Sequence, residues 1–182
     1  MKYVFSFLFL LLSSFNLYAT NNAPIEIVQA LAEQGDAKAQ FMLAEHYHEG
    51  FMVDENKSLA VAWYQKAAEQ GHKQAQFSLA TAYDIGEGVS QDLHKAAQWY
   101  EKAAMQGEGA AAYNLGIMYD EGAGFAVDKV KASTWLLVAL ALKNDLAESA
   151  WQQSSLLLNQ ASRLQAEQDA RQILQNIQHT AK

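Results

Sequence analysis

Cysteine is absent from this chain of 182 residues. No disulfide can therefore cross-link the fold, and its elements have to be held together by packing alone. The absence also excludes a thiol nucleophile and a thiolate metal site. It excludes a lipid-anchored form as well, because lipidation of an exported protein would need a cysteine.

Proline is nearly absent too, and Pro24 is the single example. Proline interrupts the interior of helices and is confined to the edges and bulges of sheets. Hydrophobic residues make up 51% of the chain, which is enough for one domain with a sizeable core. A chain with few helix breakers and this apolar content favours an all-α fold.

Basic residues are outnumbered by acidic ones, 13 to 20, which gives a formal net charge of -7. A negative surface repels phosphate backbones and anionic lipids, so we expect neither nucleic acid nor a membrane surface as a partner. Surplus acid also keeps proteins soluble, and that ordinary explanation accounts for the charge without any partner.

Residues 1–19 differ in kind from the rest of the chain. A basic start at Lys2 is followed by a largely apolar run over 4–12, and the small residue Ala19 ends the segment. This pattern predicts a cleavable secretory signal peptide, cut after Ala19 and followed by a linker over 20–24. An uncleaved membrane anchor is the alternative, although the apolar run is shorter than the roughly 20 residues that span a bilayer. We expect a periplasmic or secreted protein with no membrane contact after cleavage.

A period of 36 residues governs the segment 39–144. Unrelated segments would share well under about one identical column, so the seven that recur here establish an internal repeat. The seven columns are Ala39/Ala75/Ala111, Leu43/Leu79/Leu115, Tyr47/Tyr83/Tyr119, Gly50/Gly86/Gly122, Ala60/Ala96/Ala132, Trp63/Trp99/Trp135 and Ala67/Ala103/Ala139.

Each copy predicts two helices. Ala39, Leu43 and Tyr47 are spaced by four and share one helix face, and Gly50 suits the left-handed residue that ends a helix. Small residues around Trp63, at spacings of three and four, mark the second helix. We expect first helices over 37–49, 73–85 and 109–121, and second helices over 57–70, 93–106 and 129–143. Neither helix can bury its apolar stripe alone, whereas stacked neighbours can, and this predicts an α-solenoid.

The solenoid domain is predicted over 25–177. Residues 27–36 match the second half of a repeat, so the stack begins with a half-repeat whose helix opens near Pro24. The full repeats are expected at 37–72, 73–108 and 109–144.

The C-terminal end of the stack needs a cover. Residues 135–142 are almost wholly apolar, and a helix of that kind is buried on several sides. Apolar residues in the segments 147–158 and 166–177 predict a capping helix pair within 145–177. We expect a frayed tail over 178–182.

The repeats carry a specific signature. The third copy has Ala111, Tyr113-Asn114-Leu115-Gly116, Tyr119, Gly122-Ala123-Gly124, Asp128, Lys131-Ala132 and Trp135. In this pattern the chain resembles the Sel-one-like repeat (SLR) family, a 36-residue relative of the tetratricopeptide repeat, over about 25–177.

The chain departs from the family pattern at a few positions. Ala44 and Ala80 stand where the family has a glycine, as Gly116 does. Met52 replaces the second loop glycine that is present as Gly88 and Gly124, so the conformation of the first loop is open.

The resemblance implies a right-handed superhelix of antiparallel helix pairs. It also implies an adaptor or scaffold role for protein partners, often at the cell envelope. Some cysteine-rich relatives have been linked to penicillin binding and β-lactam hydrolysis. Because this chain has no cysteine, we do not carry that activity over.

Catalytic motifs are missing from the sequence, and we expect neither an enzyme nor a cofactor. His46 and His48 with Glu49 form the one cluster of metal-like residues. Histidines two apart on a helix point about 200° away from each other, so we expect no metal site. The repeated tryptophans could form a ligand ladder, but a fixed position among small alanines favours the core.

The first helices carry one further stripe, at spacings of four and three. By the resemblance, this face lines the concave side of the superhelix. It would carry an aromatic row edged by carboxylates, which suits recognition of a protein or peptide. Two alternatives stay open: the aromatic column packs between helices, or the acids are only a solvated face. The candidate partner-binding groove consists of Lys38, Phe41, Glu45, His48, Phe77, Thr81, Asp84, Tyr113, Ile117 and Asp120.

Two functions from different classes follow from these observations. The first is an exported, non-catalytic scaffold, expected to be monomeric, that binds a protein or peptide. The second is a hydrolase of cell-wall material or β-lactams, motivated only by the cysteine-rich relatives.

Overall fold

The computed structural model of the chain describes residues 24–180. The predicted signal peptide and most of the predicted linker, over 1–23, lie outside the described residues. Within 24–180 every regular element is a helix. The helices are α2 (Ile25–Glu33), α3 (Ala37–Glu49), α4 (Lys57–Glu69), α5 (Lys73–Ile85), α6 (Leu93–Met105), α7 (Gly109–Glu121), α8 (Lys129–Ala141), α9 (Ala147–Ser155) and α10 (Gln160–Thr180).

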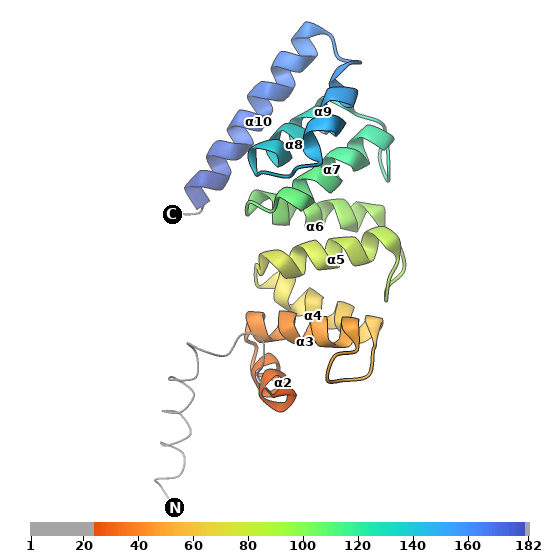
Figure 1. Ribbon diagram of the computed structural model, residues 1–182, viewed down its shortest axis with the longest axis vertical. Helices are drawn as coiled ribbons and strands as arrows, with labels where there is room; N and C mark the ends of the chain where they lie inside the picture. The colour runs from red at the N-terminus through yellow and green to blue at the C-terminus, as the bar shows by residue number, and fades with distance from the viewer. Residues whose placement is uncertain (1–23, 181–182) are drawn as a thin grey trace, which may run out of the picture.

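The helices form consecutive hairpins that stack along the long axis of the molecule, with α2 at one end and α9 and α10 at the other (Figure 1). Each of α3, α5 and α7 packs against the helix that follows it, and neighbouring hairpins pack on one another. The first helices have the predicted bounds, and the second helices end one or two residues earlier than predicted. The expected all-α solenoid is confirmed.

Polar side chains fix where the helices begin. Asn56, Asp92 and Asp128 each accept a hydrogen bond from the backbone N–H three residues on, at 3.0 Å, and so open the second helices. Asp36 and His72 do the same for α3 and α5. Such caps satisfy N–H groups that have no partner inside the helix. The 36-residue spacing of these caps keeps the helices of successive repeats in register.

The loop after each first helix contains a second left-handed residue, at Met52, Gly88 and Gly124. Met52 has φ 63°, close to the 70° of Gly88 and the 81° of Gly124. The first loop therefore keeps the conformation of the others despite its methionine. A Cβ on Gly88 would lie 2.4 Å from the carbonyl oxygen of Lys57, and one on Gly124 would lie 2.7 Å from the Cβ of Leu93. These two loops therefore rest directly on the second helix of the preceding repeat.

Small residues bring the helices close together. The recurrent alanines of both helices are buried, and Leu43, Leu79 and Leu115 are 1%, 0% and 1% exposed. The interior is a chain of three apolar clusters in which partly buried residues such as Trp63 and Trp99 border two clusters each. The core is thus quasi-linear, as expected when each hairpin contacts only its neighbours.

The prediction that all three repeated tryptophans are core residues is wrong for two of them. Trp135 is 7% exposed, whereas Trp63 and Trp99 are only half-buried. The ammonium groups of Lys66 and Lys102 lie 3.5 and 3.7 Å from the ring centres of Trp63 and Trp99. The repeated tryptophan is therefore covered by a lysine side chain in two repeats and is buried by apolar packing in the third.

Glutamines join consecutive repeats through the interior. The side-chain amide of Gln40 donates to the carbonyl oxygen of Ala32 at 3.1 Å and accepts from Gln70 at 2.7 Å. The arrangement recurs one repeat later, where Gln106 donates to Gln76 at 2.8 Å. The carbonyl at the end of one second helix is thus satisfied by the next repeat. The sequence comparison missed this relay because the third repeat lacks these glutamines.

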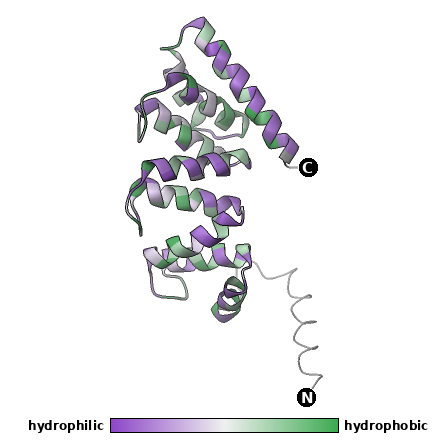
Figure 2. Cartoon of the chain, turned by 180° about the vertical axis from the view of Figure 1, so that it is seen from behind, coloured by the Kyte–Doolittle hydropathy of each residue, from purple (hydrophilic) through white to green (hydrophobic). Residues whose placement is uncertain are grey.

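The C-terminal cap differs in detail from the prediction. α10 begins at Gln160 rather than near 166 and runs unbroken to Thr180, so His179 is helical where we expected fraying. It packs along α8 through the buried residues Ala166, Ala170 and Ile177, and its outer surface is largely hydrophilic (Figure 2).

Candidate functional site

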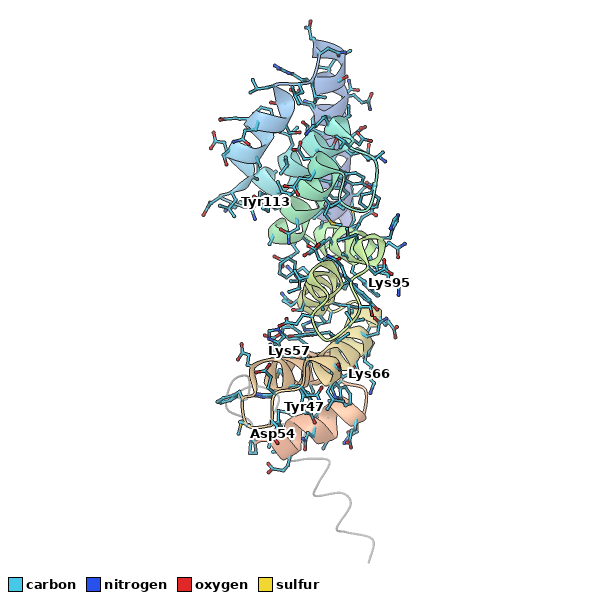
Figure 3. The ribbon with its side chains drawn as sticks, turned by 90° about the vertical axis from the view of Figure 1, so that its right-hand side faces the viewer. Tyr47, Asp54, Lys57, Lys66, Lys95 and Tyr113 are labelled. Atoms are coloured by element: carbon cyan, nitrogen blue, oxygen red, sulfur yellow. The ribbon has the colours of Figure 1, made fainter. Side chains whose placement is uncertain are left out.

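The candidate groove residues all come from α3, α5 and α7, and the structure places these helices on one side of the stack. Tyr113 lies on one edge of the molecule, and Lys66 and Lys95 of the second helices lie on the opposite edge (Figure 3). Lys38 is exposed, and the other nine residues of the predicted stripe are partly buried. The stripe is therefore a half-open surface rather than a free one.

The aromatic column packs between helices while keeping part of its surface open. The ring of Phe41 stacks on His72, with 4.7 Å between ring centres, and tilts against Tyr64 at 6.0 Å. Phe77 meets Tyr100 at 5.7 Å, and Tyr113 packs against the same cluster. Each ring is thus held by its neighbours, which lowers the entropic cost of presenting its free edge to a ligand.

Two buried tyrosines hold the acidic side of this surface. The hydroxyl of Tyr64 donates to a carboxylate oxygen of Glu45, and the hydroxyl of Tyr100 donates to Asp84 at 3.2 Å, with Thr81 also 3.2 Å away. Burial raises the pKa of Tyr100 to about 12, and burial with the Glu45 hydrogen bond raises the pKa of Tyr64 further. Both phenols therefore stay protonated and act as fixed donors.

The tyrosines were missed at the sequence level because their column is not invariant. It contains Tyr64, Tyr100 and then Leu136. The available signal was an aromatic residue directly after the repeated tryptophan in two copies. In the third copy the position facing Leu136 is Gly116, where an added Cβ would lie 2.8 Å from the Leu136 Cγ. The third repeat therefore replaces a phenol–carboxylate pair by close apolar contact.

The third acid, Asp120, has a cationic partner instead. The ammonium of Lys129 lies 2.9 Å from its carboxylate and also donates to its backbone carbonyl at 2.9 Å. Glu45 and Asp84 accept hydrogen bonds from neutral phenols, whereas the carboxylate of Asp120 is compensated by the ammonium of Lys129. The negative potential of this surface is thus concentrated on the first two repeats.

His48 connects the first two repeats. Its Nε2 lies 3.0 Å from a carboxylate oxygen of Glu87, and Lys57 lies 3.4 Å from the other oxygen. The hydrogen bond from His48 and the nearby Lys57 lower the pKa of Glu87. His48 is therefore engaged in an inter-repeat ion cluster, and it is not free for a metal. Among residues 24–180 there is no group of three or more His, Cys, Asp or Glu that could hold a metal ion.

His72 caps α5, and this makes the stability of the chain depend on pH. Its Nδ1 accepts the backbone N–H of Ala75 at 3.3 Å, which requires an unprotonated Nδ1. Burial lowers the pKa of His72 below its usual value, with Asp36 opposing this effect. A lowered pKa in the folded state means that the stabilisation is complete above the unfolded pKa of about 6.5 and is lost as the pH falls through the folded value.

We expect His72→Asn to be less sensitive to mild acid than the original chain. Asparagine caps helices well and does not titrate in this range. The difference in unfolding free energy between pH 7.5 and pH 5 should shrink by less than about 1 kcal/mol, because the side chain is partly exposed. Urea titrations of both proteins at the two pH values measure it. Equal pH dependence in both proteins would contradict the role of His72.

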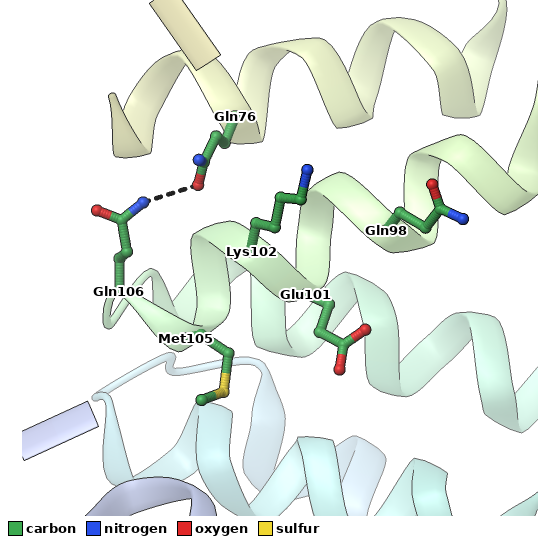
Figure 4. A pocket seen from close by; sticks show the side chains of 6 residues that line it. All are labelled: Gln76, Gln98, Glu101, Lys102, Met105 and Gln106. Carbon is green, nitrogen blue, oxygen red and sulfur yellow. Dashed lines mark hydrogen bonds between the residues drawn. The ribbon is translucent and has the colours of Figure 1, made fainter. Parts of the chain in front are cut away.

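A pocket of about 480 Å³ lies away from the predicted groove, against α6 (Figure 4). None of the ten predicted residues contributes to it. Sequence reasoning missed it because all but one of its lining residues are polar and each of these positions carries a different residue in the third repeat. The pocket is lined by Gln76, Gln98, Glu101, Lys102, Met105 and Gln106.

Comparison with known proteins identifies the repeat. The family model of the Sel1 repeat matches residues 37–72, 73–108 and 109–144. The chain belongs to the Sel1 repeat family. Proteins of this family are generally scaffolds for protein–protein interaction. Comparison with curated proteins returned no match.

Two solved Sel1 repeat structures are similar to this chain. A Sel1 repeat protein from Oxalobacter formigenes is 36% identical, with 71% of this chain and 97% of that chain covered and a TM-score of 0.65. A protective antigen present in uropathogenic Escherichia coli strains, which displays an SLR fold, is 31% identical over 88% of this chain, with a TM-score of 0.71. This chain covers 34% of that antigen, about a third of its length.

None of the described helices combines the length and the apolar character that a membrane-spanning helix needs.

Proposed function

We propose that this Sel1 repeat protein is an exported, non-catalytic scaffold that holds a protein or peptide partner on the face formed by α3, α5 and α7. Export would use the segment over 1–19, and the proposed site of action is the periplasm or the cell exterior. The expected monomeric state is part of the proposal.

One observation carries the proposal: carboxylates and aromatic rings of the first-helix face are held in place but remain partly open. Glu45 and Asp84 are oriented by buried phenols that leave their charges uncompensated. Phe41 and Phe77 are packed from behind and half-buried. A preorganised surface of this kind binds with little ordering cost, and it favours a partner with basic and apolar side chains.

We expect the double substitution Glu45→Gln and Asp84→Asn to weaken capture of the partner by about tenfold or more. Both amides keep an oxygen that can accept the tyrosine hydrogen bonds, so the fold is retained while the charge is removed. Crosslinking in cells followed by mass spectrometry identifies the partner, and titration of the purified pair measures the affinity.

The matched control is Glu33→Gln with Glu69→Gln, which removes two carboxylates from exposed positions on α2 and α4. This variant should bind the partner normally. Equal affinity of the two variants and the original chain would reject the first-helix face as the binding surface.

A further inference from the structure

The pocket on α6 and the part of α8 that α10 covers are the same surface in successive repeats. Polar lining residues of the pocket are replaced by apolar or small ones where α10 packs. The clearest replacements, one repeat on, are Gln76 to Ala112, Glu101 to Leu137, Lys102 to Val138 and Gln106 to Leu142. The fold thus shows one repeat surface with a helix bound to it and a second one open.

The covered copy shows what this surface accepts. Val138 on α8 is 0% exposed, and α10 contributes Ala166, Ala170 and Ile177, which are buried and lie at spacings of four and seven. The small residues allow close approach, and the isoleucine fills the space near the end of the helix. The surface therefore fits the narrow apolar stripe of an amphipathic helix.

In the open copy, a single lysine side chain covers the repeated tryptophan. The ammonium of Lys102 lies 3.7 Å from the ring centre of Trp99, and Lys66 covers Trp63 in the same way. Within 24–180 neither lysine forms an ion pair with a carboxylate. Lys102 extends toward α5, the helix that carries Gln76, and Met105 points the opposite way, so that an apolar side chain lines the other side of the pocket (Figure 4).

We propose that the pocket on α6 binds an amphipathic helix of a partner protein in the way that α10 covers α8. The partner helix would carry a stripe of small and aliphatic residues, flanked by a carboxylate for Lys102 and a basic side chain for Glu101. α10 itself has this chemistry, because Glu167 and Arg171 form an ion pair of 3.9 Å beside its apolar stripe. The site is formed by α6 with Gln76 of α5, and it shares none of its lining residues with the ten residues predicted for the first-helix face.

The position of α10 supports such a second layer. Its last turns reach α6, where a Cβ on Gly107 would lie 3.7 Å from Ile177. A helix on α6 would therefore lie beside the end of α10 and extend the layer that α10 begins.

A fluorescein-labelled peptide of residues 160–180 tests the proposal with the full chain as receptor. We expect saturable binding that Lys102→Glu weakens by about tenfold, a loss of about 1.4 kcal/mol. Lys131→Glu is the matched control, since Lys131 is also exposed and lies 5.1 Å from the ring centre of Tyr119. A peptide with Ala166→Arg and Ala170→Arg should not bind.

Each result decides the proposal. Selective weakening by Lys102→Glu, together with loss of binding by the arginine peptide, supports a helix site on α6. Absence of binding overturns it. So does binding that both lysine substitutions leave unchanged, because the peptide would then be replacing α10 on α8. Weakening by Glu45→Gln and Asp84→Asn instead would assign the peptide to the first-helix face and also overturn it.

Discussion

Replacing Trp135 by alanine is expected to lower the free energy of unfolding by about 3–5 kcal/mol, the usual loss for a buried tryptophan. The ring is 7% exposed and belongs to the buried cluster that also contains Ala139, Ala170 and Ile177. Its removal leaves a cavity in that cluster. The cavity cannot collapse easily, because α8 also packs against α7 and α9.

Trp99→Ala is the matched comparison and should lower stability by roughly 2 kcal/mol. Trp99 has the same position in its repeat but is half-buried under the side chain of Lys102. Urea denaturation of both variants, followed by circular dichroism, measures the two losses. Equal losses would show that cover by α10 adds nothing to the contribution of the tryptophan.

The contrast between these tryptophans shows how far the sequence could lead. A residue that is identical in all three repeats indicates that its position has the same role in each hairpin. The helix bounds could be predicted from the pattern of these residues. This pattern does not indicate what lies outside the hairpin. Trp135 belongs to the same buried cluster as Ala170 and Ile177 of α10, about 35 residues or more further on, whereas Lys66 and Lys102 cover the earlier copies. Exposure was therefore set by a long-range contact that repeat alignment does not contain.

The candidate site shows the same limit. The stripe on the first helices was predictable because it follows helix spacing, but its partners come from other helices. Tyr64 and Tyr100 reach Glu45 and Asp84 across the hairpin, and Leu136 breaks that column in the third copy. Searching for identical columns hides such pairs. Comparing which columns change together, Tyr64 and Tyr100 with Ala44 and Ala80 but Leu136 with Gly116, would have indicated that these two columns face each other. It would not have indicated the carboxylates, because Glu45 and Asp84 lie in two different columns.

Gly88→Ala is expected to lower the free energy of unfolding by about 3 kcal/mol. Two costs combine at this position. Gly88 has φ +70°, a conformation that costs alanine roughly 1–2 kcal/mol. The new Cβ would also lie 2.4 Å from the carbonyl oxygen of Lys57, which is backbone and cannot rotate away. The loop would have to lift from α4, and the contacts of Glu87 with His48 and Lys57 would be lost with it.

Gly71→Ala separates the two costs. Gly71 has φ +86°, but a Cβ there meets nothing within 4 Å, so only the conformational cost of roughly 1 kcal/mol applies. Urea denaturation of the two variants should differ by about 2 kcal/mol, which is the cost of the lost loop contact. Met52, in the corresponding loop of the first repeat, already shows that a side chain is tolerated at φ 63°. If both substitutions lowered the free energy of unfolding equally, the contact between the Gly88 loop and α4 would contribute nothing to stability.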